Sequence, residues 1–444
     1  MTFNQKMVRS VAAVAVIGAV ASISIVGGSA NADPQYTTGL VGVGSDTTQD
    51  VTNALAGFAP TPSGGIVANG RFVPAIASNG QQLVSFDATN PDPASTDTCI
   101  TSRPGGPLFQ RPNGSTNGRA ALSRASTAPS LTNRWGSTAC GGLKDISGQF
   151  DFARSSSGPS SGDTGTDLTY SVLGRDAVSL AFYRTGVATS TIDPVASASA
   201  QLKTRWTRAE LTALYTNTSA AGGIQVVTAD DGSTPVNVLP CAIQAGSGTQ
   251  RFVLTAFGLN AGQETAATSV CEALGGTGRL QENDSTALKA KGDLAPPNTQ
   301  VVVGFSVGAF VGKSNGVAGP NPQTDQVGVA AITNAVATGT AVPLGLGYSG
   351  TAPNLTPSST FYSGVNFGRT IYNVIPTARI DSLFGNDGLK SMFKDPDLTT
   401  TTNGPLQAAI CTQPATIERF GFLVSANCGS TLLKGSFIAG TTNV

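Results

Sequence analysis

Short apolar runs alternate with segments of helical spacing along most of this chain. The runs that predict strands are residues 37–43, 83–86, 149–157, 175–183, 236–240, 301–306 and 369–376. The segments that predict helices are residues 51–58, 207–215, 280–288, 331–338 and 388–393. Strands that alternate with helices favour an α/β fold with substantially parallel sheets, in which ligands bind where strands end and helices begin.

The turn at 245–250 is the clearest example of a polar turn that leads into a helix. Ser247 and Gln250 have the spacing of a capping box, and two glycines allow a tight turn and close approach of a ligand. The first N–H groups of a helix have no internal partner and carry the positive end of its dipole. With the hydroxyls of Ser247 and Thr249 they form a candidate anion site. Taken alone, these residues are explained more simply by an ordinary capped helix.

Three further turns have a similar character. Asp46 or Ser45 is the expected N-cap of the first helix, with Gln49 as its partner in a capping box. The turn at 111–118 again places a serine after a glycine before a helical segment. The strand over 149–157 ends in three serines beside Arg154, which is either a solvated loop residue or part of a site. The turns together strengthen the anion hypothesis.

Composition excludes several classes of function. Among 444 residues there is no histidine, and 26 basic residues balance 26 acidic ones. Zero net charge without a basic block argues against a nucleic-acid partner. Without histidine, a Ser-His-Asp triad, a Cys-His dyad and a His-ligated metal are impossible, although carboxylate, Lys or Tyr catalysis is not. We therefore expect no catalytic residue, no metal and no cofactor.

Residues 1–32 have the pattern of a secretory signal. Lys6 and Arg9 precede an apolar run over 11–26, and a small-x-small motif predicts cleavage after Ala32. A membrane anchor is the alternative, but the run is shorter than a typical spanning helix. There is no cysteine at the cleavage site, so no lipid anchor is expected there. The mature protein is expected to be secreted, periplasmic or in the cell envelope.

An even number of cysteines suggests disulfide bonds in an exported chain. The candidates are Cys99, Cys140, Cys241, Cys271, Cys411 and Cys428. Six cysteines allow 15 pairings, so the connectivity stays open, although pairing of sequence neighbours would close loops of modest length. There is no CxxC spacing, which argues against zinc binding and thiol redox chemistry.

The order of these motifs resembles the phosphate-binding protein of the ABC phosphate uptake system, a type 2 periplasmic-binding-protein fold. The resemblance covers most of residues 37–310. Its motifs are similar to Gly-Val-Gly-Ser-Asp-Thr at 42–47, Gly-Ser-Thr-Asn-Gly at 114–118, Asp-Phe-Ala-Arg-Ser-Ser at 151–156 and Ser-Gly-Thr at 247–249. The order of the motifs is more specific than any one of them.

The resemblance implies that an oxyanion is held by hydroxyls and by backbone N–H groups at helix starts. The positions that carry this over are Ser45, Asp46, Thr47, Ser115, Ser155, Ser247, Gly248 and Thr249. Two positions depart from the family. Ile243, with Gln244 beside it, stands where the family has an arginine, and Ser156 stands where it has the aspartate that accepts a proton from phosphate. Arg154 and Asp46 are the expected substitutes, because an arginine can bind an oxyanion through two donors and a carboxylate can accept from a protonated phosphate.

The resemblance further implies a two-lobed fold with mixed, mainly parallel sheets and a hinge cleft. Residues 33–178 and 306–444 would form one lobe, with insertions at about 59–112 and 312–360, and residues 179–305 the other. The implied function is that of a monomeric, non-enzymatic solute-binding protein that takes an oxyanion, first of all phosphate, to an ABC transporter permease. A secreted phosphatase-like enzyme on the same fold is one alternative. A surface interaction protein that has lost the ligand is another, favoured by the missing lipid anchor and the Gly/Pro-rich insertions.

Overall fold

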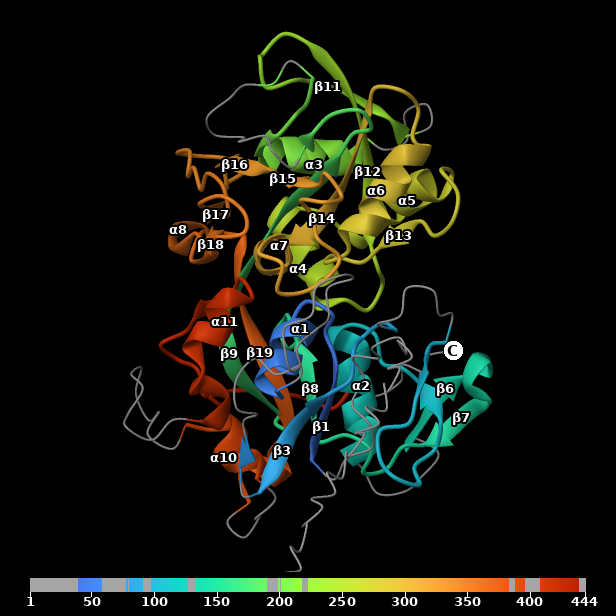
Figure 1. Cartoon of the computed structure of the whole chain (residues 1–444), viewed down its shortest axis with the longest axis vertical. Helices are drawn as coiled ribbons and strands as arrows, with labels where there is room; N and C mark the ends of the chain where they lie inside the picture. The colour runs from blue at the N-terminus through green and yellow to red at the C-terminus, as the bar shows by residue number, and fades with distance from the viewer. Residues whose placement is uncertain are drawn as a thin grey trace, which may run out of the picture. The chain divides into compact units, whose positions relative to one another are not determined.

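The longest described strand, β9 (Leu168–Tyr183), belongs to both groups of strands in the main sheet (Figure 1). Its first part pairs antiparallel with β19 (Gly368–Pro376), and its last part pairs antiparallel with β14 (Thr299–Ser306). The sequence predicts only the part over 175–183, because polar residues such as Ser171 interrupt the apolar pattern before it. The strand is therefore the direct connection between the two groups.

The computed structural model describes ten parts of the chain. These are residues 39–57, 77–78, 80–90, 97–126, 133–189, 199, 201–217, 223–382, 388–395 and 408–438. The expected signal, its cleavage site and much of the insertion at 59–112 lie outside the described residues. Within the described residues, no helix is long and apolar enough to cross a membrane.

The first group of strands contains the N-terminal elements. Strand β1 (Leu40–Gly44) lies between β3 (Gln81–Ser85) and β8 (Phe152–Ser155) and pairs parallel with both, and β8 pairs antiparallel with β19. Helix α1 (Gln49–Leu55) packs on β3, and helix α2 (Ser115–Ser126) packs on β8 and β1. The carboxyl ends of β1 and β8 are thus placed beside the start of α2.

The second group is built on two buried parallel strands, β12 (Pro235–Ile243) and β14. Helix α4 (Gly248–Phe257) follows β12 directly. Helix α5 (Ala261–Glu272) packs on β12, and α6 (Ser285–Leu294) packs on β14. Strand β11 (Gln225–Thr228) adds to the edge of β12 in antiparallel orientation. The carboxyl end of β12 therefore lies next to the start of α4.

The remaining elements are short. They are β2 (Ala77–Ser78), β4 (Cys99–Ile100), β5 (Phe109–Gln110), β6 (Arg134–Ser137), η2 (Thr138–Cys140), β7 (Gly142–Asp145), β10 (Arg205–Thr207), α3 (Arg208–Thr216), β13 (Arg279–Leu280), α7 (Val307–Ser314), β15 (Gly328–Val329), β16 (Ala331–Asn334), β17 (Tyr348–Ser349), β18 (Thr356–Pro357), α8 (Ser359–Tyr362), α9 (Thr377–Ile380), α10 (Leu389–Phe393), η5 (Ala409–Cys411), α11 (Pro414–Arg419), β20 (Leu423–Val424) and β21 (Leu433–Gly435). The predicted α/β fold is confirmed. The sheet is mixed because β9 and β19 run antiparallel to their neighbours.

The buried apolar side chains of the described residues form three clusters. One contains the second group of strands, with residues such as Val238 and Val302, and also includes Val329 and Phe361 from the chain after α7. The other two lie on either side of the first group, one around α1 and the C-terminal helices and one around α2. Part of the segment after residue 306 therefore packs with the second group.

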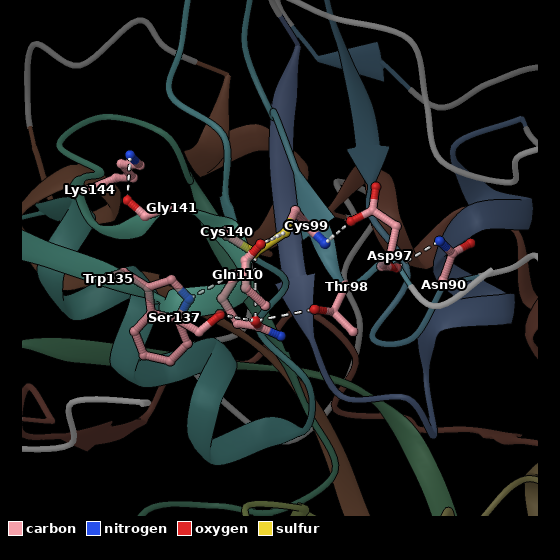
Figure 2. The surroundings of a disulfide bond; sticks show 11 residues. Asn90, Asp97, Thr98, Cys99, Gln110, Trp135, Ser137, Cys140, Gly141 and Lys144 are labelled. Carbon is pink, nitrogen blue, oxygen red and sulfur yellow. Dashed lines mark hydrogen bonds between the residues drawn. A yellow bond between two sulfur atoms is a disulfide. The ribbon is translucent and has the colours of Figure 1, made fainter.

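Three disulfide bonds join neighbouring cysteines in the sequence: Cys99–Cys140, Cys241–Cys271 and Cys411–Cys428. The second of these joins β12 to α5 inside a buried cluster. The first lies beside Gln110, whose side-chain oxygen also accepts from the Ser137 hydroxyl at 2.6 Å (Figure 2). Such bonds persist in oxidising compartments.

Three predictions about local structure are wrong. The segment 331–338 is not helical, because β16 pairs parallel with β10. Residues 345–360, which the sequence leaves without structure, contain β17, β18 and the start of α8. The first helix is not capped by Asp46 or Ser45, because it begins after Thr48, and the Gln49 side chain accepts from the backbone of Ala88 at 2.9 Å.

Candidate functional site

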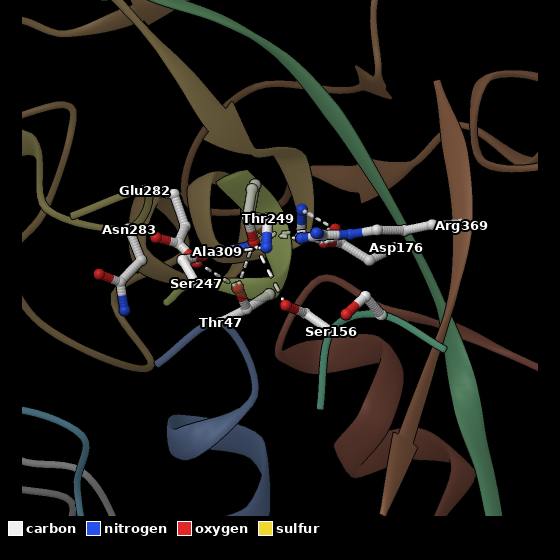
Figure 3. Close-up of polar contacts among 12 residues, drawn as sticks. Thr47, Ser156, Asp176, Ser247, Thr249, Glu282, Asn283, Ala309 and Arg369 are labelled. Carbon is white, nitrogen blue, oxygen red and sulfur yellow. Dashed lines mark hydrogen bonds and ion pairs between the residues drawn. The ribbon is translucent and has the colours of Figure 1, made fainter. Parts of the chain in front are cut away.

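Five hydroxyl side chains from four turns meet in one buried place, which we call the hydroxyl cluster. They are Thr47, Ser115, Ser156, Ser247 and Thr249, and each is at most 3% exposed. The hydroxyl of Thr249 lies 2.9 Å from that of Thr47 and 3.4 Å from that of Ser156 (Figure 3). The hydroxyl of Ser156 in turn lies 3.1 Å from that of Ser115. The polar turns that the sequence identifies separately therefore converge.

The start of α4 places two of these hydroxyls. Ser247 is the N-cap, as predicted, and its hydroxyl accepts from the backbone N–H groups of Thr249 at 2.9 Å and Gln250 at 3.2 Å. The reciprocal half of the predicted capping box is missing, because the Gln250 amide donates to Glu264 at 2.6 Å. The cap fixes the first turn of the helix and leaves the Thr249 side chain directed at the cluster.

Gly248 allows this helix start to lie against the other turns. A Cβ atom at this position would lie 2.5 Å from Oγ of Ser115 and 2.6 Å from Oγ of Ser156, which is closer than real contacts permit. The backbone N–H of Thr116 also donates to the carbonyl of Gly246 at 2.9 Å. The starts of α2 and α4 are therefore in direct contact, and the contact requires a glycine.

The start of α2 is held against the sheet in a similar way. A Cβ atom on Gly118 would lie 2.4 Å from the Cα of Gly44 at the end of β1. The backbone N–H of Ser156, just after β8, donates to Oγ of Ser115 at 3.0 Å. Strand ends and helix starts thus meet at the hydroxyl cluster, as expected for ligand sites in α/β folds.

Two buried acidic side chains border the cluster. One carboxylate oxygen of Glu282 accepts from the hydroxyls of Ser247 and Thr47, the latter at 3.2 Å (Figure 3). The Asn283 amide donates to the backbone carbonyl of Asp46 at 3.1 Å. Asp46 is 1% exposed and Glu282 is 0% exposed. The site therefore combines hydroxyl donors with carboxylate acceptors.

The two acids influence each other. Burial raises the pKa of the Asp46 carboxyl well above its usual range, and the nearby charge of Glu282 raises it further. A side-chain hydrogen bond with Glu282 raises this pKa as well. Among the described residues, no other group donates to Oε2 of Glu282 or to either carboxyl oxygen of Asp46. Asp46 is thus favoured in its protonated form, which can donate a hydrogen bond.

Arg154, the predicted cation of the site, lies behind the first turn. Its guanidinium donates to the carbonyl oxygens of Ser45 at 3.0 Å and Gly44 at 3.5 Å, and to the hydroxyl of Ser85 at 2.6 Å. These bonds hold the guanidinium against the backbone that follows β1. The prediction that Arg154 contacts an anion stays a prediction.

Three other predicted residues take different positions. The Ser155 hydroxyl donates to the carbonyl of Ser157 at 2.7 Å, so it stabilises its own turn. The Gln244 amide donates to Asn113 at 2.7 Å and accepts from Gln281 at 2.6 Å. The Ser45 backbone N–H donates to the Arg154 carbonyl at 3.1 Å, while its buried hydroxyl has no hydrogen-bond partner in the described parts of the chain. Ser155 and Gln244 therefore have partners outside the cluster.

A buried ion pair lies on the neighbouring strands. The Arg369 guanidinium on β19 donates through Nε at 3.0 Å and through Nη2 at 2.6 Å to one oxygen of Asp176 on β9 (Figure 3). Asp176 also accepts from the Ser306 hydroxyl and from the backbone N–H of Gly308 at 2.9 Å, at the start of α7. The guanidinium lies 5.6 Å from the centre of the Phe252 ring on α4. This network ties β9, β19, α7 and α4 together.

The sequence does not identify Glu282 and Asn283 as site residues. They belong to a polar run, 281–284, directly between β13 and α6, and that run predicts only a polar first helical turn. Their burial depends on β13 pairing with β12, which is a long-range contact. The strand-to-helix position is the one signal that could have singled them out.

No family model matches this chain, and no curated protein is similar to it at a significant level. Among solved structures, the chain is similar to a protein from Clostridium perfringens that is described as a phosphate ABC transporter substrate-binding protein and was solved with bound phosphate. That match has 10% identity and a TM-score of 0.37, over 76% of this chain and 86% of the other. A second match is an ABC-type phosphate transport receptor from Vibrio cholerae, with 14% identity and a TM-score of 0.36, over 70% and 85% of the two chains. Identities and scores this low do not assign a ligand or site residues to this chain.

Proposed function

We propose that this protein binds a tetrahedral oxyanion at the hydroxyl cluster, with phosphate as the leading candidate. The observation that carries the proposal is the convergence of five buried hydroxyls from four separate turns. Hydroxyl donors and a capped helix start are the groups that hold dehydrated oxyanions in proteins. The ten-residue helix α4 supplies the positive end of a dipole at the same place.

The two acids would select the protonation state of the anion. A carboxylate accepts a hydrogen bond from a protonated phosphate but repels a fully ionised sulfate. Glu282 is placed for this role, because it already accepts from two hydroxyls of the cluster. Protonated Asp46 would act as a further donor. We therefore expect phosphate and arsenate to bind and sulfate to be excluded from the cluster.

Binding would require the two strand groups to move apart. The Thr47 hydroxyl of the first group and the Thr249 hydroxyl of the second are in direct contact, so an anion must separate them. We propose that the groups are two lobes, 33–178 with 306–444 and 179–305. Part of the segment after 306, around Val329 and Phe361, would move with the second lobe, because it packs there. The hinge would lie where β9 passes between the groups, as in hinge closure around ligands.

The same proposal covers the cellular role. An exported, non-enzymatic solute-binding protein, acting as a monomer, would pass the anion to an ABC transporter permease. The three disulfide bonds support export into an oxidising compartment.

Calorimetric titration of the mature protein with phosphate, arsenate and sulfate tests the ligand. We expect phosphate and arsenate to bind with micromolar affinity, and sulfate to bind to the cluster at least about 100-fold more weakly. Thr249→Val should reduce phosphate affinity by about tenfold or more, because it removes one donor. Thr216→Val is the matched control, since that hydroxyl lies away from the cluster, where it donates within helix α3 and accepts from the Gln263 amide. A folded protein that releases or absorbs no heat with phosphate would overturn the proposal.

One observation favours a second candidate. The hydroxyls of the cluster already bond one another, and the guanidinium of Arg154 is bonded to backbone elsewhere. Such an arrangement is also expected of a surface interaction protein that kept this fold and lost the ligand. A thermal melting temperature that no oxyanion shifts would support this second candidate.

A further inference from the structure

Two arginines beside the hydroxyl cluster donate to the same carbonyl oxygen. Arg119 on α2 reaches the Gly158 carbonyl through Nη1 at 3.5 Å, and Arg251 on α4 reaches it through Nη2 at 2.7 Å. The two guanidinium groups are therefore neighbours, although they come from different helices. The loop after Ser156 runs between them.

The other partners of both side chains are neutral. Arg119 donates to the Tyr170 hydroxyl at 2.7 Å and to a backbone carbonyl of its own helix. Arg251 donates to the hydroxyls of Ser157 at 2.8 Å and Ser160 at 3.3 Å. Among the described residues, no carboxylate forms an ion pair with either of these two arginines. Asp163, which is within electrostatic range of Arg119, is bonded to Ser436 and Gly165 instead.

The arginine pair has unused binding capacity. Nη2 of Arg119 is buried and has no hydrogen-bond partner among the residues that the structure describes, and the residue is only 2% exposed. Burial, together with the nearby charge of Arg119, lowers the pKa of Arg251 to about 10. Two like charges that are close together and partly desolvated destabilise the fold unless an anion neutralises them.

We propose that Arg119 and Arg251, with the hydroxyls of Ser157 and Ser160, form a second anion site that takes a fully ionised tetrahedral oxyanion. The groups proposed to bind the anion are guanidiniums and hydroxyls, which can donate to it. They include no carboxylate, which would require a proton on the ligand. Guanidinium groups bind the oxygens of sulfate and of phosphate groups through paired donors. Its preference therefore differs from that of the hydroxyl cluster, where the carboxylate of Glu282 disfavours sulfate. The proposal does not depend on phosphate binding at the cluster.

Sulfate is the probe that separates the two sites. We expect sodium sulfate to bind the mature protein in calorimetry when ionic strength is held constant with chloride. Arg251→Gln should weaken sulfate binding by about tenfold or more, since it removes a positive charge and the paired N–H donors of the guanidinium. Arg208→Gln is the matched control, because the Arg208 guanidinium also donates to backbone carbonyls, those of Thr255 and Ala256 on α4, but does not contact the loop after Ser156. Thr249→Val should leave sulfate binding unchanged.

Thermal unfolding provides a second measurement that does not depend on heats of binding. Sulfate should raise the melting temperature of the wild type and of Arg208→Gln above the value in chloride, but not that of Arg251→Gln. A wild type that sulfate neither binds nor stabilises would overturn the proposal, and so would an Arg251→Gln variant with unchanged sulfate affinity. Loss of sulfate binding in Thr249→Val would show one shared site and would also overturn it. Loss of phosphate binding alone would overturn only the proposed function of the hydroxyl cluster.

Discussion

The side-chain oxygens of Thr47 and Thr249 lie 2.9 Å apart, although 202 positions separate the two residues in the chain. One follows strand β1, and the other is in the first turn of helix α4. The contact therefore joins the two groups of strands at the place where four polar turns meet. A ligand that binds between these two hydroxyls must replace the contact between Thr47 and Thr249.

Gly248→Ala should disrupt the cluster more than any loss of a single hydroxyl. The added methyl group would lie 2.5 Å from Oγ of Ser115 and 2.6 Å from Oγ of Ser156, so α4 must shift away from both. We expect a loss of about 1–3 kcal/mol in the free energy of unfolding. Phosphate affinity should fall by at least about tenfold, as measured by calorimetry.

Gly262→Ala on α5 is the control for this change. A Cβ atom there would meet only a side-chain oxygen of Asn260, at 3.3 Å. Alanine favours a helix by up to about 1 kcal/mol over glycine, so stability should be unchanged or higher. If Gly248→Ala behaves like Gly262→Ala, the close contact at the start of α4 is not required.

Asp46→Asn should stabilise the protein at neutral pH. The pKa of Asp46 is raised in the folded state above the usual value of 3.8, so folding favours the protonated form. Stability should therefore fall as pH rises from about 4 towards the folded pKa, and an asparagine, which cannot ionise, should avoid this fall. We expect the variant to melt about 2 °C or more above the wild type at pH 7, and the difference to disappear below pH 4.

Asp231→Asn should change the stability at neutral pH in the opposite direction. Hydrogen bonds from Thr234 and Ser233 lower the pKa of this exposed carboxyl to about 2. Its contribution to stability is present above pH 3.8 and is lost as pH falls towards 2, so the asparagine variant should melt slightly lower at pH 7. An Asp46→Asn variant that also melts lower at pH 7 would show that the ionised form of Asp46 is stabilised in the fold.

The order of elements and the convergence of the polar turns could be predicted from the sequence. Apolar runs that end in Gly and Ser identify strand ends followed by helix starts, and in an α/β sheet such ends lie together. The N-cap role of Ser247 follows from its local sequence alone. The length of β9 could not be predicted, because its first part is buried by C-terminal strands that the local pattern does not reveal.

The charged residues around the hydroxyl cluster could be predicted less well from the sequence. Arg154 is close to the predicted site in sequence, but its guanidinium is taken up by the carbonyls of Gly44 and Ser45. Glu282 is far away in sequence and enters the site through the pairing of β13 with β12. Side-chain direction decides the position of Arg154, and long-range strand pairing decides that of Glu282. Neither can be inferred from a single sequence.

Asp176→Ala should be strongly destabilising. The substitution leaves the Arg369 guanidinium buried without the carboxylate that it pairs with, and Nη1 of that residue already has no hydrogen-bond partner among the described residues. Loss of one partner from a buried ion pair costs about 3–5 kcal/mol, which urea denaturation would measure. Replacing both residues, in Asp176→Ala with Arg369→Met, should cost less than the sum of the single changes.

An exposed ion pair supplies the contrast. Asp381, whose side chain is 45% exposed, pairs with Lys394 and Lys434, and its replacement by alanine should cost no more than about 1 kcal/mol. A similar cost for Asp176→Ala would mean that water reaches the Arg369 guanidinium.

Removal of the Cys241–Cys271 disulfide should destabilise the protein by about 3 kcal/mol or more. Closure of a loop of this length stabilises by roughly that amount, and both sulfur atoms lie in a buried cluster. The double variant Cys241→Ala and Cys271→Ala would be compared by urea denaturation with Cys411→Ala and Cys428→Ala, which opens a shorter loop. The first variant should lose more stability, and the reverse order would contradict this account.

Strand β9 also has a consequence for how the molecule unfolds. If the second group of strands separated first, the last part of β9 would lose its ladder with β14 while the first part stayed paired with β19. Such a partial state is disfavoured, because β9 is one continuous strand. Loss of its pairing with β14 would expose backbone groups next to the part that still pairs with β19. We therefore expect all three buried clusters to melt in one cooperative transition. In hydrogen exchange, the amides around Ala177 and Val178 should be among the last to exchange.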